Sequence, residues 1–250
     1  MNLQKIMHRI LCVLFSLFFL SGCAAVRPVS GEPANGAGRY AAASTNMQET
    51  DITICVDAGH GFDDIGTFSD YLGDAAEKDI TLPVAFHLKE ALESAGFTVI
   101  MTHDGESFPR TSEDDGNNVF NPQERVAYAD TLDIDYFISV HCDSYTADSS
   151  VNGTRIYCSK GTKYSKESLK AAQLITESVN QTFPDAKKSL LREMSEREAY
   201  YVIRETQVPS ALVEIGFVTN RTDALNMLND EWRKGIAQGI SDGIVRFFTE

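Results

Sequence analysis

The chain lacks an excess of basic residues. Lysine and arginine together number 22, aspartate and glutamate number 36, and the formal net charge is −14 at pH 7. Nucleic-acid binding depends on basic side chains that neutralise phosphates, so this balance argues against nucleic acid as a partner. A solvated acidic face is the usual meaning of such a balance, and the charge says little else about partners.

Two common hydrolase motifs are missing, and cysteine is scarce. The sequence contains neither H-E-x-x-H, typical of zinc proteases, nor G-x-S-x-G, typical of serine hydrolases. Of the 5 cysteines, Cys12 and Cys23 belong to the N-terminal segment, which leaves Cys55, Cys142 and Cys158 in or beside apolar runs. This odd number predicts buried free thiols, with one disulfide as the alternative, and excludes a disulfide framework.

The N-terminal apolar run is too short for a comfortable membrane span. Ile10 to Leu20 falls short of the roughly 20 residues that a span needs, follows Lys5 and Arg9, and leads into Leu20-Ser21-Gly22-Cys23. It predicts a secretory signal over residues 1–22, and the alternative is an uncleaved anchor. The four residues Leu20-Ser21-Gly22-Cys23 resemble the lipobox of bacterial lipoproteins. The resemblance implies a lipid on Cys23 and an extracytoplasmic protein attached to the membrane.

The remaining sequence divides into a tether and one domain. Residues 23–50 are rich in Ala, Gly, Ser, Pro and Asn and have few large apolar side chains. Such a segment buries too little surface to offset its ordering entropy, so we expect it to be flexible. Residues 51–250 have the size of one domain with a full core. We find no internal repeat and no second domain, and we expect a monomer.

Strand-like and helix-like segments alternate along the domain. The patterns predict strands at Ile52 to Asp57, Thr98 to Thr102, Tyr136 to His141, Thr154 to Cys158, Ala199 to Ile203 and Ala211 to Ile215. They predict helices from near Asp79 to Gly96, from Asn121 to about Leu132, from near Ser165 to Pro184, and from about Glu231 to Phe248. This alternation predicts a three-layer α/β domain with a twisted, largely parallel sheet flanked by helices.

Two of the predicted strands end in a histidine. Ile52 to Gly61 reads I-T-I-C-V-D-A-G-H-G and places His60 between two glycines, and the run that begins at Tyr136 ends at His141. Glu214 lies near the end of another predicted strand. Because sites in such sheets form at the carboxyl ends of strands, we expect these three side chains to lie together. Two histidines at one sheet edge predict a metal site.

Five segments of the domain form a set. They are V-D-A-G-H-G at Val56 to Gly61, the pair Glu77-Lys78, Arg125, S-V-H-C-D-S at Ser139 to Ser144, and V-P-S-A-L-V-E-I-G-F-V-T-N at Val208 to Asn220. In this order they resemble the motifs of the zinc-dependent N-acetylmuramoyl-L-alanine amidases. The resemblance implies an α/β enzyme that cuts the amide between N-acetylmuramic acid and the L-alanine of the peptidoglycan stem peptide. Ala58, Cys142 and Asp143 depart from the family pattern, but none of these changes removes a proposed ligand.

The same resemblance implies the roles of four residues. His60, Glu77 and His141 would hold one zinc ion, and Glu214 would be the catalytic carboxylate. Catalytic zinc typically has three nitrogen or oxygen ligands and an open position for water, whose pKa it lowers to about 7. A carboxylate that is not a ligand then takes the water's proton and passes it to the leaving nitrogen, which suits Glu214.

Several alternatives stay open at the level of sequence. Asp74 or Asp79 would serve as a ligand in place of Glu77. Arg125 and Asp143 are candidates for substrate contact, although Arg125 is equally suited to hold a loop by an ion pair. The acidic loop Asp104 to Phe120 either shapes the substrate groove or is a solvated excursion. We assign His87 and His103 to helix and surface structure.

Two rival functions also remain. A cysteine hydrolase would use Cys142 as its nucleophile with His60 or His141 as the base. A non-catalytic peptidoglycan-binding lipoprotein would keep the fold without the chemistry. The presence of Glu214 together with all three proposed ligands favours the amidase.

Overall fold

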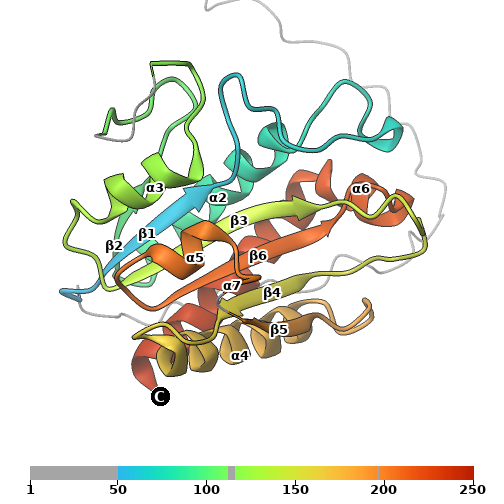
Figure 1. Cartoon of the computed structure of the whole chain (residues 1–250). Helices are drawn as coiled ribbons and strands as arrows, with labels where there is room; N and C mark the ends of the chain where they lie inside the picture. Colours follow the sequence, from blue (N-terminus) through green and yellow to red (C-terminus); the bar gives the residue numbers. More distant parts are fainter. Residues whose placement is uncertain (1–49, 112–115, 196) are drawn as a thin grey trace, which may run out of the picture. The chain divides into compact units, whose positions relative to one another are not determined.

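The computed structural model describes residues 50–111, 116–195 and 197–250 (Figure 1). The predicted signal at residues 1–22, the lipidation site Cys23 and the predicted tether up to residue 49 lie outside the described residues and stay predictions. Within the described ranges, no helix combines the length and the apolar character needed to cross a membrane.

A single mixed sheet organises the described part of the domain. Its 6 strands lie in the order β2-β1-β3-β6-β4-β5. All neighbouring strands run parallel except β4 and β6. The strands are β1 Thr53–Ala58, β2 Thr98–Met101, β3 Tyr136–Asp143, β4 Arg155–Ser159, β5 Leu190–Met194 and β6 Ser210–Phe217. The predicted α/β class with a largely parallel sheet is therefore confirmed.

Helices cover both faces of this sheet and make three layers (Figure 1). One face packs against α2 Lys78–Ser94, α4 Ser165–Thr182 and α7 Asp230–Thr249, and the other against α3 Pro122–Ala129 and α5 Tyr201–Glu205. Successive residues of a strand point to opposite faces. Val56 and Val213 accordingly belong to the larger core under α2, α4 and α7, whereas Cys55 and Leu212 belong to the smaller core under α3 and α5.

The predicted start of α3 is confirmed by its capping contacts. The Asn121 side chain accepts a hydrogen bond from the Glu124 amide, and the Glu124 carboxylate accepts one from the Asn121 amide, both at 2.9 Å. This reciprocal capping box fixes where the helix begins. It also places Arg125 in the first turn, with its side chain directed at the end of β1.

The segment after α4 differs from the prediction. Ala199 to Ile203, predicted as a strand, runs into the short helix α5, and β5 was not predicted. Periodicity alone does not separate a short apolar strand from a helical turn, and here Val202 and Ile203 pack into the smaller core as part of a helix. β5 is an edge strand with Arg192 and Glu193 exposed, so it lacks the apolar pattern of the inner strands. The short elements η1 Asp70–Leu72 and α6 Arg221–Met227 were also missed.

Candidate functional site

His60 lies in a left-handed turn directly after β1. Its φ is 64°, and the φ of Phe62 is 58°, a region that residues other than glycine seldom adopt. A Cβ atom at Gly59 would lie 2.3 Å from Cε1 of His141, and one at Gly66 would lie 2.7 Å from Oε2 of Glu77. Glycine at both positions therefore lets the backbone approach these side chains closely.

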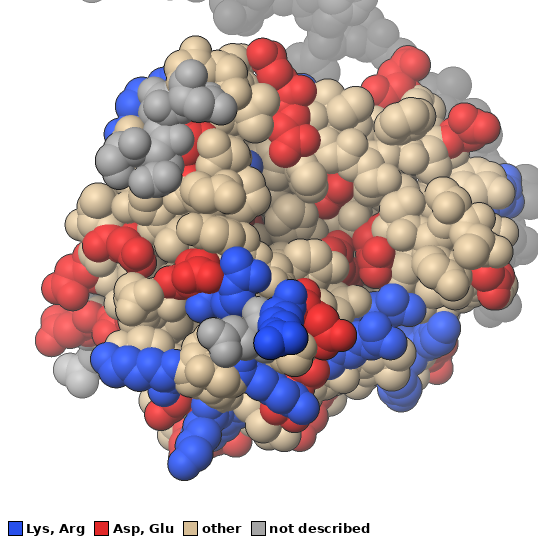
Figure 2. Space-filling model, viewed as in Figure 1, with Lys and Arg blue, Asp and Glu red and all other residues tan. Residues whose placement is uncertain are grey.

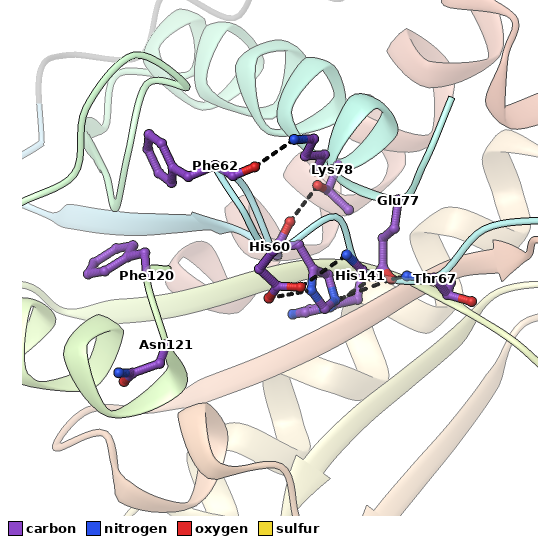
Figure 3. A network of polar contacts seen from close by, with 12 residues as sticks. His60, Phe62, Thr67, Glu77, Lys78, Phe120, Asn121 and His141 are labelled. Carbon is purple, nitrogen blue, oxygen red and sulfur yellow. Dashed lines mark hydrogen bonds and ion pairs between the residues drawn. The ribbon is translucent and has the colours of Figure 1, made fainter. Parts of the chain in front are cut away.

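The structure brings together the three residues predicted as ligands. His60, Glu77 and His141 each offer a ligand atom, and these atoms all lie within 4.8 Å of one another. Both imidazole rings point toward the Glu77 carboxylate (Figure 3). Nε2 of His60 lies 3.2 Å from Oε2 of Glu77, and Nδ1 of His141 lies 3.0 Å from Oε1.

Asp74 and Asp79, the alternatives to Glu77, do not belong to this cluster in the described part of the chain. Asp79 instead accepts a hydrogen bond from the Ala76 amide at 2.9 Å. The geometry thus selects Glu77 among the three carboxylates.

Neighbouring groups hold the three side chains in place. The amides of Thr67 and Cys142 donate to the two oxygens of Glu77 at 2.9 and 2.8 Å. Oδ2 of Asp64 lies 2.8 Å from Nδ1 of His60, on the far side of the ring from Glu77. Such contacts fix the orientation of a metal-binding side chain. Asp64 was not predicted, because it lies in an irregular loop where no periodicity marks it.

The electrostatics of the cluster suit a cation. Burial would raise the pKa of Glu77, but hydrogen bonds from His141 and His60 hold this pKa far below its usual range. Burial would lower the pKa of His60, whereas Glu77 and Asp64 raise it above its ordinary value. An ionised carboxylate thus lies between two imidazoles, and its negative charge favours a cation at this place.

The donor set also fits zinc sterically. Two ligand atoms at ~2.0–2.2 Å from a tetrahedral ion lie roughly 3.3–3.6 Å apart. The separations of 3.2 and 3.0 Å between the histidine nitrogens and the Glu77 oxygens are close to this distance. A small outward shift of the rings would accommodate an ion.

Glu214 lies beside this cluster, where the register pairs it with His141 across β3 and β6. Its side chain is 5% exposed, and Oε2 has no hydrogen-bond partner among the described residues. Burial, followed by the negative charges of Glu77 and Asp143, raises the pKa of Glu214 well above its usual value. A structural buried carboxylate normally has its oxygens satisfied, so this arrangement points to a functional group.

Arg125 does not reach a substrate surface. It is 3% exposed and donates to Asp57 at 2.7 Å. It also donates to the carbonyl oxygens of Phe120, Ala58 and His60 at 2.8, 2.6 and 2.6 Å. Of the two roles that the sequence left open, the structure supports the ion pair, which ties the turn bearing His60 to α3.

Asp143, the second candidate for substrate contact, is partly exposed at the end of β3. One of its oxygens lies 3.4 Å from a terminal nitrogen of Arg155, and the Arg155 guanidinium lies 4.4 Å from the centre of the Phe217 ring. The Tyr200 hydroxyl acts to lower the pKa of Glu214, against the larger effect of burial. Neither Arg155, on β4, nor Tyr200, in the segment that was predicted as a strand, was predicted to lie at the site.

Cys142 points away from the site. Its thiol belongs to the larger core on the opposite face of the sheet from His141. Burial, followed by the charges of Glu77 and Glu214, raises the pKa of the Cys142 thiol well above its usual value. A buried neutral thiol is a poor nucleophile, so the structure argues against the cysteine-hydrolase hypothesis. Cys55 and Cys158 are likewise buried and free, as predicted.

The acidic loop packs against the turn that carries His60. The Phe108 ring lies 4.8 Å from the Phe120 ring and 4.6 Å from the Phe62 ring. The Asp63 amide donates to the carbonyl of Asn118 at 3.1 Å. The described parts of this loop therefore support the turn, and a role in shaping a groove stays a prediction.

His87 lies in helix α2, as predicted, whereas the assignment of His103 to the surface is wrong. His103 is 4% exposed, and its Nε2 lies 2.9 Å from the carbonyl oxygen of Ala58.

Comparisons with known proteins point to one family. A family model described as N-acetylmuramoyl-L-alanine amidase matches residues 54–246. The probable cell wall amidase LytH of Staphylococcus epidermidis is 33% identical over 199 residues, which cover 79% of this chain and 58% of that protein. The N-acetylmuramoyl-L-alanine amidase LytC of Bacillus subtilis is 28% identical over 196 residues, which cover 78% of this chain and 35% of that protein. The chain thus spans 58% or less of the length of these two relatives.

A solved structure shares the fold. The N-acetylmuramoyl-L-alanine amidase AmiC2 of Nostoc punctiforme matches with a TM-score of 0.67 and 26% identity, covering 80% of this chain and 98% of that one.

Proposed function

The chain belongs to the N-acetylmuramoyl-L-alanine amidase family, and we propose that it hydrolyses the amide between N-acetylmuramic acid and the L-alanine of the peptidoglycan stem peptide. One observation carries this proposal: His60, Glu77 and His141 converge next to Glu214, whose Oε2 has no partner among the described residues. Relatives named as cell wall amidases support an extracytoplasmic site of action. The lipid anchor at Cys23 and the monomeric state are proposed from the sequence.

His60, Glu77 and His141 would hold one zinc ion per chain. Two imidazoles and one carboxylate form a donor set typical of catalytic zinc. When bound, zinc supplies a positive charge that polarises a carbonyl group and lowers the pKa of a water molecule to about 7. Asp64 fixes the ring of His60, and backbone amides fix the carboxylate of Glu77, so the chain presents these ligands already oriented.

Glu214 would carry the proton in the reaction. Its raised pKa makes it a stronger base than an exposed glutamate, which suits a group that accepts a proton from the attacking water. The hydroxyl joins the carbonyl carbon of the muramic acid, the carbon–nitrogen bond breaks, and Glu214 returns the proton to the nitrogen of L-alanine. The products are a muramic acid carboxylate and a peptide with a free amino terminus.

The test compares wild type, Glu214→Gln and Glu193→Gln on purified peptidoglycan, with mass spectrometry of the released peptides. Glu193 is an exposed glutamate on the edge strand and serves as the matched control. We expect wild type and Glu193→Gln to release stem peptides that begin with L-alanine, and a chelator to abolish the release. Glu214→Gln should keep its zinc and lose about 10²–10⁴-fold in rate.

Two results would count against this scheme. A Glu214→Gln protein that holds zinc and stays fully active would refute the proton-transfer role. A zinc-loaded wild-type protein that binds peptidoglycan without releasing peptides would instead identify a non-catalytic wall-binding protein.

A further inference from the structure

The sheet face that carries the site continues outward onto β4 and β5. The register pairs His141 with Glu214, Glu214 with Arg155, and Tyr157 with Arg192. Residues paired across neighbouring strands share one face of a sheet. Arg155 therefore lies directly beside the proposed catalytic carboxylate, and Arg192 lies one strand further out, on the edge of the sheet.

The edge strand of this face is open to solvent, because Leu190 is 47% exposed and Arg192 is also exposed. On β4, Tyr157 is 4% exposed, and its ring lies 5.4 Å from that of Tyr200, which precedes α5. On the opposite face of the same strands, α4 packs against β4 and β5. Most of the basic side chains visible in Figure 2 lie in its lower half, with acidic side chains among them, although the whole chain has a net charge of −14.

Arg155 and Arg192 differ in whether their guanidinium groups have a partner in the chain. Arg155 pairs with Asp143 and lies over the ring of Phe217, so its position is fixed. Arg192 forms no ion pair among the described residues, and the register places it on the same face of the sheet as Arg155 and Glu214. An exposed guanidinium on this face without a partner is suited to bind a carboxylate of a ligand with two parallel hydrogen bonds.

We propose that the β4–β5 face binds the stem peptide in an extended form and that Arg192 recognises a free carboxylate on the residue that follows L-alanine. This inference rests on the proposed function, because that function places the scissile amide at Glu214. Neighbouring strands are spaced about 4.8 Å apart, which puts β5 roughly 10 Å from β6. An extended peptide advances about 3.3–3.6 Å per residue, so its second residue passes over β4 within reach of a long side chain on β5.

The experiment measures a preference ratio rather than bulk activity. The substrates are two soluble muramyl tripeptides that differ in one group, a free carboxylate or an amide on the residue after L-alanine. Zinc-loaded wild type, Arg192→Gln and Lys166→Gln are compared by the ratio of kcat/KM on the acid to kcat/KM on the amide. Lys166 is an exposed residue of α4, on the other side of the sheet, and removes the same charge.

The expected ratio is about tenfold in favour of the acid for wild type and Lys166→Gln, as for a charge-assisted hydrogen bond at an exposed position. It should fall to near one in Arg192→Gln, through a higher KM for the acid. The preference of the wild type should also shrink at high salt. A wild-type ratio near one, or an unchanged ratio in Arg192→Gln, would overturn the inference and leave the hydrolase assignment intact.

Failure of the proposed function gives a different pattern. If zinc-loaded wild type cleaves neither substrate, the hydrolase assignment fails, and calorimetry then tests the binding face separately. Glu214→Gln is titrated with the acid and amide tripeptides, with and without Arg192→Gln. Tenfold weaker binding of the amide that disappears in the double variant supports the acidic-peptide face, and equal binding of both peptides overturns it.

Discussion

Replacing Arg125 by methionine should destabilise the domain strongly. The substitution removes the guanidinium that lies 2.7 Å from Asp57, a carboxylate with no exposed surface. Burial would raise the pKa of Asp57, but Arg125 and the hydroxyls of Ser139 and Thr102 lower it from 3.8 to about 2. At 1.36 kcal/mol per pKa unit this corresponds to about 2 kcal/mol of folding free energy. Breaking a buried pair by removing one partner typically costs ~3–5 kcal/mol, so we expect a loss of about 2–5 kcal/mol at pH 7.

The pH dependence of this loss has a defined sign. In the wild type, the pKa of Asp57 is lower in the folded than in the unfolded state, so its stabilising contribution is complete above pH 4 and is lost as the pH falls toward about 2. In the variant, burial without a counter-charge raises the pKa of Asp57 above its unfolded value. The free energy of unfolding of the variant is then lowered at pH 7, and part of this loss is recovered at lower pH, where Asp57 takes up a proton. The difference from wild type should be largest at pH 7 and smaller at pH 4.

Urea unfolding of the metal-free proteins, followed by the fluorescence of the single tryptophan, measures the effect at pH 7 and pH 4. Arg246→Met is the control, because it removes a guanidinium that pairs with Glu177 and Glu250 at the surface. Surface pairs contribute ~0–1 kcal/mol, so this control should change little. A loss below about 1 kcal/mol for Arg125→Met at pH 7, or an equal loss at both pH values, would refute the reasoning.

Two further predictions concern the metal ligands. Gly66→Ala should lose zinc, because the added Cβ would lie 2.7 Å from Glu77 and His60, whereas Gly73→Ala should keep it. The two glycines have nearly the same positive φ, 68° and 64°, but a Cβ at Gly73 meets nothing within 4 Å; equal zinc contents in the two variants by atomic absorption would contradict the steric argument. Asp64→Ala should weaken zinc binding by about 10–100-fold, because it removes the partner of Nδ1 of His60. Competition with a fluorescent chelator measures this affinity, and an unchanged value would show that Asp64 does not orient the ring.

The sequence predicts the inner part of this fold and site well because local signals mark it. His60 follows the buried strand β1 and His141 lies near the end of the buried strand β3, and parallel strands carry their carboxyl ends to one edge. The α3 start was predictable because Asn121 and Glu124 satisfy each other within one turn. Glu77 required the resemblance to a family, since a charged residue before a helix is common and two neighbouring aspartates offered the same chemistry.

The outer part was not predictable for a physical reason. Arg192 lies on an edge strand, where most residues are exposed and the apolar alternation that marks inner strands is lost. Tyr200 precedes a helix of one turn, too short for a period to show. Asp64 and Arg155 contact residues of other segments only in the folded chain, and their local sequence does not predict those contacts.

Arg125 links stability to chemistry through one guanidinium. It compensates the buried charge of Asp57 and also donates a hydrogen bond to the carbonyl oxygen of His60, a residue whose positive φ costs roughly 1–3 kcal/mol. The contacts of Arg125 therefore hold the turn in its strained conformation. It follows that Arg125→Met should weaken folding and zinc binding together. Asp64→Ala removes the contact with the His60 ring and one hydrogen bond from the Gly66 amide in a surface loop, so it should weaken zinc binding with little loss of folding free energy. If Arg125→Met lowers the free energy of unfolding but leaves the zinc affinity unchanged, the ion pair and the metal centre are independent.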